Sequence, residues 1–217
     1  ALPIYAHAED VSLQVKRSAS ELKRLHEAAE EGISAPLFAL PQNGGSETAA
    51  RRGTAYHKVF ETVDFGKTWN EETLTAFLDE LAERGALEPD DRDLLSADPI
   101  LKFLASETAA RMARADRAGK LHRESSFVMA VPAHAADPSV QSEEPVVVQG
   151  VMDAWFEEAG KLILLDYKTD RNRDAAHYVE NYTAQLSLYA RALEMTEGKP
   201  VAEKLIYALS AGELLAL

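Results

Sequence analysis

Residues 162–170 read LILLDYKTD, an apolar run that ends in two acids and a lysine. A short apolar run of this length, without polar alternation, is typical of a strand buried on both faces. Side chains two residues apart on a strand point to the same face, so Asp166 and Lys168 are expected side by side. The segment therefore predicts a buried strand that ends in a carboxylate and an ammonium group.

A second acid, Asp153, interrupts the preceding apolar run, residues 146–156. If the chain turns back near Glu158–Gly160, the two runs form a hairpin and Asp153 lies within a rung or two of Asp166. Two neighbouring carboxylates repel each other unless a cation lies between them, and hard oxygen ligands suit Mg²⁺ or Mn²⁺. The pair of acids thus predicts a divalent-metal site.

The residues by themselves leave an ordinary structural interpretation open. An acid and a lysine at the end of a strand also form common surface salt bridges, and this alternative accounts for Asp166 and Lys168 alone. It does not account for Asp153, because a carboxylate within an apolar run needs a partner once it is buried.

Two helical patterns add further polar side chains. Gly53 and His57 are four residues apart and share one face of a predicted helix, where the glycine allows another group to approach the imidazole. Tyr182, Gln185 and Tyr189 share a face of a later helix, and their polar ends suit hydrogen bonds to a metal-site carboxylate or a phosphate. Both patterns are also compatible with side chains at the edge of a core.

The periodicity predicts a helical first half followed by strands and one more helix. A capping box at Ser18–Glu21 starts a helix that runs to about Glu31, and a loop follows over residues 32–48. The further helices are expected over 49–63, over 71–84 after the N-cap Asn70, from Pro89 and Pro99 to about 117, and over 175–197. The strands are expected over 121–131, 146–156, 162–167 and 201–209, with a loop over 132–145 and a further strand at the C-terminus. This order predicts an α/β (α+β) fold with a central mixed sheet flanked by helices.

Composition restricts the classes of protein and of site. The chain has 217 residues and a formal net charge of −13, which argues against a protein that holds nucleic acid by non-specific contacts with phosphates. It has no cysteine, so disulfides, thiolate zinc and iron–sulfur clusters are excluded. No apolar stretch approaches the length of a membrane helix, and we expect no membrane partner. Gly66-Lys67-Thr68 lacks the earlier glycine of a phosphate loop, because that position is Glu61, so we expect no ATP site in this chain.

Taken together, these motifs resemble a known family. Gly53-x-x-x-His57, Gly150-x-x-Asp153, Asp166-Tyr-Lys168-Thr and Gln185-x-x-x-Tyr189 occur in this order. The chain resembles the RecB-type branch of the PD-(D/E)xK nucleases over about residues 15–215, and the closest likeness is to the C-terminal nuclease domain of AddA-type helicase–nuclease subunits. The resemblance implies a restriction-endonuclease-like core.

The resemblance implies a role for each matching residue. His57, Asp153, Asp166 and the backbone carbonyl of Tyr167 would bind the divalent metal. The implied catalytic residues are Asp153, Asp166, Lys168, which would orient water or stabilise negative charge, and Glu124, an acid of the corresponding strand in relatives. The implied supporting or DNA-contacting residues are Thr169, Arg171, Gln185 and Tyr189.

The implied activity is Mg²⁺-dependent cleavage of single-stranded DNA, with Mn²⁺ as a substitute, during double-strand-break repair and recombination. The implied partners are the helicase domains of a longer polypeptide and a second, AddB-like subunit, in the bacterial cytoplasm. Residues 1–217 are then expected to form one nuclease domain, with a helical part at about 15–118 and an α/β catalytic core at about 119–217. The chain begins with Ala1 and its first methionine is Met112, which we expect of a domain from a larger protein. The alternatives are a silent nucleic-acid-binding or docking module with a degenerate site, and an unrelated metal hydrolase acting on a small phosphoester.

Overall fold

Six strands form one mixed sheet in the computed structural model, which describes residues 16–18, 47–136, 142–170 and 174–217. The strands are β1 (Lys16–Ser18), β2 (Leu121–Pro132), β3 (Pro145–Glu158), β4 (Lys161–Lys168), β5 (Val201–Ala208) and β6 (Glu213–Ala216). Their order is β1-β3-β4-β5-β6, and β2 pairs with β3. The β1–β3 and β4–β5 pairs are parallel and the others antiparallel. The predicted central mixed sheet is therefore confirmed.

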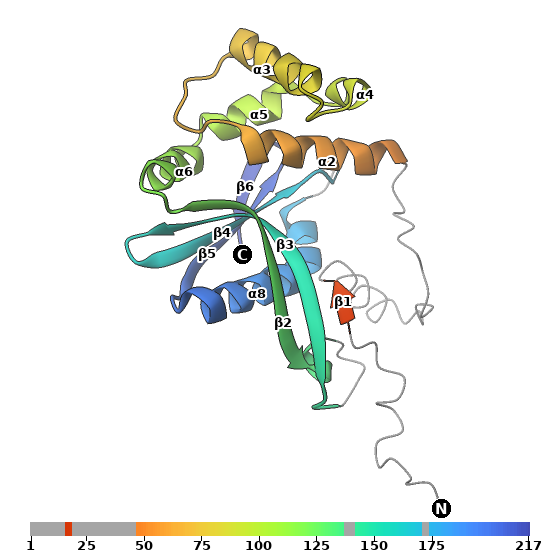
Figure 1. The fold of residues 1–217 in the computed structure, drawn as a ribbon, viewed down its shortest axis with the longest axis vertical. Helices are drawn as coiled ribbons and strands as arrows, with labels where there is room; N and C mark the ends of the chain where they lie inside the picture. Colours follow the sequence, from red (N-terminus) through yellow and green to blue (C-terminus); the bar gives the residue numbers. More distant parts are fainter. Residues whose placement is uncertain (1–15, 19–46, 137–141, 171–173) are drawn as a thin grey trace, which may run out of the picture.

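Helices cover both faces of this sheet (Figure 1). They are α2 (Glu47–Thr62), α3 (Glu71–Glu83), α4 (Pro89–Arg92), α5 (Ala97–Leu104), α6 (Glu107–Arg117), α7 (Ala133–Ala136) and α8 (Ala175–Glu197). Helices α2 to α6 lie on one side and the long α8 on the other (Figure 1). Each side has its own cluster of buried apolar side chains, so the sheet separates two cores.

Strand β3 has different neighbours along its length, and this difference creates the site. One edge pairs with β2 throughout, from Pro145 to Phe156. The other edge pairs with β1 at residues 147–149 and with β4 at residues 154–158. Among the described residues, positions 150–153 therefore have no strand on that edge. Strands β3 and β4 diverge just beyond the pair formed by Ala154 and Leu165.

Most predicted elements are present, with differences at their ends. Helix α8 has the predicted bounds, and Asn70 caps α3 in a capping box with Thr73. Helix α5 begins at Ala97 rather than at Pro99, because a proline in the first turn lacks an N–H that would be unbonded there anyway. Helix α2 begins at residue 47, within the predicted loop. The helix predicted from Ser18 to Glu31 falls at residues 19–46, outside the described residues.

Two short elements had no signal in the sequence. Strand β1 has 3 residues and helix α7 has 4, and both are too short for a periodic pattern. The β3–β4 hairpin turns at Ala159 and Gly160, near the predicted place, with φ angles of 50° and 77°. Two positive φ angles in a two-residue loop fit the twist of the flanking strands.

An aromatic stack supports the end of β4 from below. The ring of Phe60, in α2, lies parallel to that of Tyr167 with 4.2 Å between centroids. Phe103 contacts both rings edge-on, at 5.2 Å and 5.5 Å. All three side chains are buried, so α2, α5 and β4 are held together directly under the residues that the sequence predicts to be functional.

We expect Phe60→Ala to lower the free energy of unfolding by about 3–5 kcal/mol, because it leaves a cavity under Tyr167. Chemical denaturation measures this loss. Phe77→Ala in α3 is the matched control, since Phe77 is only partly buried against the same core and should cost less. A loss below about 1 kcal/mol for Phe60→Ala would show that the stack contributes little.

Candidate functional site

Two buried carboxylates lie where β3 and β4 diverge. Asp153 and Asp166 directly follow the last pair of these strands, Ala154 and Leu165, and are 9% and 2% exposed. The backbone N–H of Tyr167 donates a 2.7 Å hydrogen bond to Oδ2 of Asp153, which fixes this carboxylate across the gap. The predicted closeness of the two acids is therefore confirmed. Burial raises the pKa of Asp166 to about 6, and the charge of Asp153 adds to this effect while Lys168 opposes it.

His57 reaches this gap from α2. Its Nδ1 lies 3.2 Å from Oδ1 of Asp153, and its Nε2 lies 3.1 Å from the carbonyl oxygen of Tyr167. Burial of His57 disfavours its charged form, but its hydrogen bond with Asp153 and the charge of that residue prevail and raise the pKa of His57. Both ring nitrogens thus face oxygen atoms that the sequence predicts as metal ligands.

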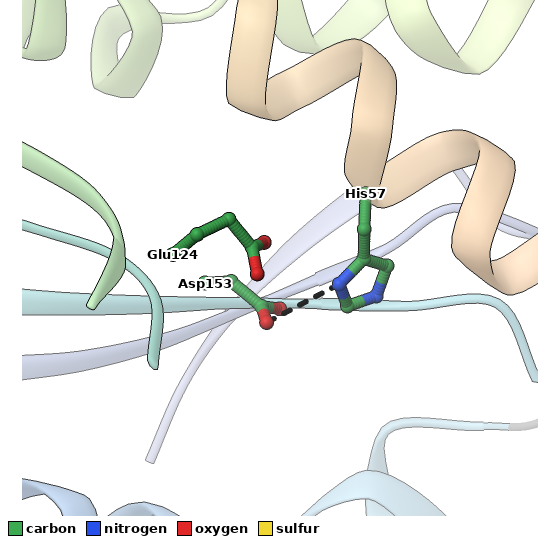
Figure 2. A group of neighbouring side chains, drawn as sticks. All are labelled: His57, Glu124 and Asp153. Atoms are coloured by element: carbon green, nitrogen blue, oxygen red, sulfur yellow. Dashed lines mark ion pairs between the residues drawn. The ribbon is translucent and has the colours of Figure 1, made fainter. Parts of the chain in front are cut away.

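Glu124 approaches the same group from β2 (Figure 2). It lies between the cross-strand pairs Arg123–Ala154 and Ser125–Met152, and so directly opposite Asp153. Its φ of 47° is in the left-handed region that non-glycine residues rarely adopt, and such backbone strain is found most often at functional sites. Burial, followed by the charge of Asp153, raises the pKa of Glu124.

Lys168 forms an ion pair with Asp166 inside the protein rather than at its surface. Its Nζ lies 2.5 Å from Oδ2 of Asp166, and the two side chains are 14% and 3% exposed. Nζ also donates a 3.4 Å hydrogen bond to Gln185 and lies 4.4 Å from the ring centre of Tyr182. Burial would lower the pKa of Lys168, but the two neighbouring acids outweigh it and raise that pKa, so the ammonium group stays charged. This burial excludes the surface salt bridge that the sequence left open.

One face of α8 holds these side chains in place. Gln185 donates a 2.7 Å hydrogen bond to the hydroxyl of Tyr189, and burial raises the pKa of that hydroxyl to about 12. The hydroxyl of Tyr182 donates to Oδ2 of Asp170 at 2.6 Å. The three polar ends therefore form hydrogen bonds within the protein and fix the surroundings of Lys168.

A cleft of about 570 Å³ brings most of the predicted site residues together. Its lining comprises His57, Ser126, Phe127, Val128, Gln149, Gly150, Val151, Asp153, Asp166, Lys168, Gln185 and Tyr189. Thr169 does not line it. This residue lines a second cavity of about 400 Å³, and its carbonyl accepts a 2.7 Å hydrogen bond from Arg52. Arg171 lies outside the described residues.

The donor atoms suit a hard divalent cation. Among the described residues, ligand atoms of His57, Glu124 and Asp153 all lie within 4.8 Å of one another. The carbonyl of Tyr167 is an additional oxygen beside His57. Asp166 is outside that close group and contacts Lys168 instead. One imidazole with carboxylate and carbonyl oxygens is a ligand set for Mg²⁺ or Mn²⁺, and a cation would also relieve the repulsion between Asp153 and its neighbouring acids.

Two contacts of this site could not be recognised from the sequence. The ring of Tyr182 faces the ammonium group of Lys168, whereas the sequence suggested only that its hydroxyl had a role. Arg52 binds the backbone beside Lys168, and the adjacent Arg51 pairs with Asp91 at 2.6 Å. A tyrosine near an acid–lysine motif or a pair of arginines has no spacing that distinguishes these contacts from ordinary ones.

Comparison with known proteins gives consistent results. The model of a family described as the PD-(D/E)XK nuclease superfamily matches residues 21–215. A relative from Bacillus licheniformis, named as the AddA-type chain of an ATP-dependent helicase/nuclease, is 32% identical over 232 aligned positions, which cover 97% of this chain and 19% of the relative. A protein of the same name from Clostridium kluyveri is 31% identical, covering 98% of this chain and 18% of the relative.

The chain thus spans about a fifth of the length of these relatives. A structural comparison with the crystal structure of SSO0001 covers 90% of this chain and 73% of that chain, at 12% identity and a TM-score of 0.36. That likeness is too distant to compare individual residues. None of the helices in the described part of the chain is both long and apolar enough to span a membrane.

Proposed function

This chain belongs to the PD-(D/E)XK nuclease superfamily, and from this membership we propose that it hydrolyses phosphodiester bonds of single-stranded DNA with Mg²⁺ as its cofactor. The single observation that carries the proposal is the cleft in which His57, Asp153, Asp166 and Lys168 all take part. Nucleases of this superfamily use divalent metals, and the donor set of the cleft fits one.

His57, Asp153, Glu124 and the carbonyl of Tyr167 are the proposed ligands, with Asp166 at the boundary between the metal and Lys168. When bound, a divalent cation would lower the pKa of coordinated water and compensate charge on a phosphate oxygen. The tyrosine N–H holds Asp153 across the gap, so this ligand does not need to be ordered at the moment of binding.

Lys168 is the proposed catalytic cation. Its ammonium group remains charged and is oriented by Asp166, Gln185 and the ring of Tyr182. A preoriented positive charge in a site with little water stabilises negative charge that develops on the phosphate, and it can also hold an attacking water molecule. Gln185 and Tyr189 are proposed as supporting residues, and Thr169 and Arg171 as residues near the path of DNA.

We further propose that the chain is one nuclease domain that works beside helicase domains and an AddB-like subunit in the bacterial cytoplasm, during repair and recombination of double-strand breaks. The names of the relatives support this proposal, since they join helicase and nuclease in one protein. It also reconciles the net charge of −13 with a DNA substrate, because a motor that delivers the strand removes the need for strong non-specific binding.

Metal dependence tests the proposal directly. The 217-residue chain should cut a single-stranded oligonucleotide with Mg²⁺ or Mn²⁺, leave 5′-phosphates, and lose all activity in EDTA. Calorimetric titration with Mn²⁺ should show binding that disappears in His57→Ala. Binding of Mn²⁺ with turnover of nitrophenyl phosphate but not of oligonucleotides would favour a small-phosphoester hydrolase. A protein that binds no Mn²⁺ would instead be the silent module.

A further inference from the structure

A surface beside the cleft has no role in the chemistry described above. Strands β2 and β3 extend beyond the carboxylates as a two-stranded ribbon (Figure 1). Three of its cross-strand pairs share one face, and together we call them the uncharged strip: Ser126–Val151, Val128–Gln149 and Ala130–Val147. Cross-strand partners lie on the same face of a sheet, and alternate pairs along a ribbon share that face.

The uncharged strip faces away from the core. Met129 and Val131, which alternate with it on β2, are buried at 7% and 1% exposure. By contrast, Val128 is 71% exposed and Val151 is 42% exposed. Exposed apolar side chains of this size that cluster on one face mark a binding surface more often than a lone exposed valine does.

The strip continues into the site. Ser126, Val128, Gln149 and Val151 line the same cleft as Asp153 and Lys168. A molecule held at the carboxylates therefore has to pass over the first two pairs of the strip. From the level of Asp153 to the Ala130–Val147 pair the ribbon extends roughly 20 Å, at about 3.4 Å per residue.

Charge determines which occupant fits. In a chain with net charge −13, a phosphate-bearing strand is repelled by most of the surface, and the strip carries neither an acid nor a base. Neutral, partly apolar side chains provide van der Waals contact for bases and sugars without attracting or repelling phosphates. In a duplex the bases face each other, so only an unpaired strand can offer its bases to such a surface.

We propose that the uncharged strip binds the nucleobases of an unpaired DNA strand and guides that strand to the carboxylates. This inference rests on the proposed nuclease function and deepens it, because it identifies the part of the molecule that selects single strands. The strip is a positioning surface, since it touches the substrate away from the reacting phosphate.

The test compares two fluorescein-labelled oligonucleotides that have the same phosphates, one of thymidines and one in which a central run is replaced by abasic sites. Anisotropy with Ca²⁺ in place of Mg²⁺ measures their affinities for the full 217-residue chain. The base-bearing strand should bind about fivefold more tightly, as expected when bases cover one or two exposed valines. Val128→Thr should reduce this preference, and Val128→Asp should weaken binding of both strands about tenfold.

Val179→Thr and Val179→Asp are the matched controls, because Val179 is 48% exposed on α8 and does not line the cleft. Both should bind the two oligonucleotides as the unmodified protein does, and thermal unfolding should be unchanged for the exposed Val128 substitutions. Equal affinity for the two oligonucleotides, or an unchanged preference in Val128→Thr, overturns the inference while Mg²⁺-dependent cleavage still supports the proposed function. Failure of the proposed function is a different result, namely no cleavage of either strand by the unmodified protein.

Discussion

Lys168→Met is expected to lower the rate of DNA cleavage by about 10²–10³-fold, because it removes a preoriented charge at the site of the reaction. Methionine keeps an unbranched side chain of similar length, so the contacts of the stem with Tyr182 should persist. The loss should appear in kcat measured at saturating oligonucleotide, since the change affects the transition state more than binding of the substrate.

Lys161→Met is the matched control for this variant. Lys161 begins the same strand at its opposite end and is exposed, so the same change of charge should leave cleavage almost unaltered. Cleavage by Lys168→Met at more than about a tenth of the original rate would contradict the catalytic role of the ammonium group.

The ion pair predicts a specific pattern in the double variant. Asp166 and Lys168 lie 2.5 Å apart and act on the same phosphate in the proposed reaction, so their effects should not multiply. We expect Asp166→Asn/Lys168→Met to be within about tenfold of the poorer single variant, as is usual for residues that act as a unit. A rate equal to the product of the two single effects would show that they act independently.

Asp153→Asn is expected to weaken Mn²⁺ binding by at least about 100-fold and to reduce cleavage by about 10³-fold, because it removes a charged ligand. Calorimetry and a cleavage assay measure the two effects. The asparagine oxygen can still accept the hydrogen bond from Tyr167, so the free energy of unfolding should change little.

Asp153→Ala separates charge from architecture. It removes the acceptor of that buried N–H as well, and should therefore cost about 1–3 kcal/mol of stability in addition to the loss of metal binding. Asp90→Asn, at an exposed position in α4, is the control for a change of one charge. Full cleavage activity in Asp153→Asn would remove Asp153 from the site.

Local pattern was sufficient for most of the fold. The apolar run before Asp166, the N-cap Asn70 and the period of residues 175–197 predicted β4, α3 and α8, because each depends on neighbours in the sequence. The nearness of Asp153 and Asp166 was also predictable, since a short hairpin leaves only a few possible registers. Strand β1 was not predicted, because its pairing with β3 joins residues far apart in the chain.

The site was predicted in part, and the missing part is long-range. His57 was a candidate on the sequence, but its distances to Asp153 and to the carbonyl of Tyr167 depend on how α2 packs on the sheet. Glu124 was named from a family resemblance alone, and its place opposite Asp153 follows from the register of β2 with β3.

The sequence by itself determined which side chains bear the chemistry and the elements that carry them, because periodicity, capping and hairpin length act over a few residues. Only the tertiary structure decided that Lys168 is buried beside Asp166, that β3 leaves an open edge at residues 150–153, and that an uncharged strip continues from the cleft. The physical reason is that burial and proximity are properties of surfaces brought together from distant parts of the chain. A carboxylate and an amine have the same composition in water and in a closed cleft, but the surroundings set their charge and reach.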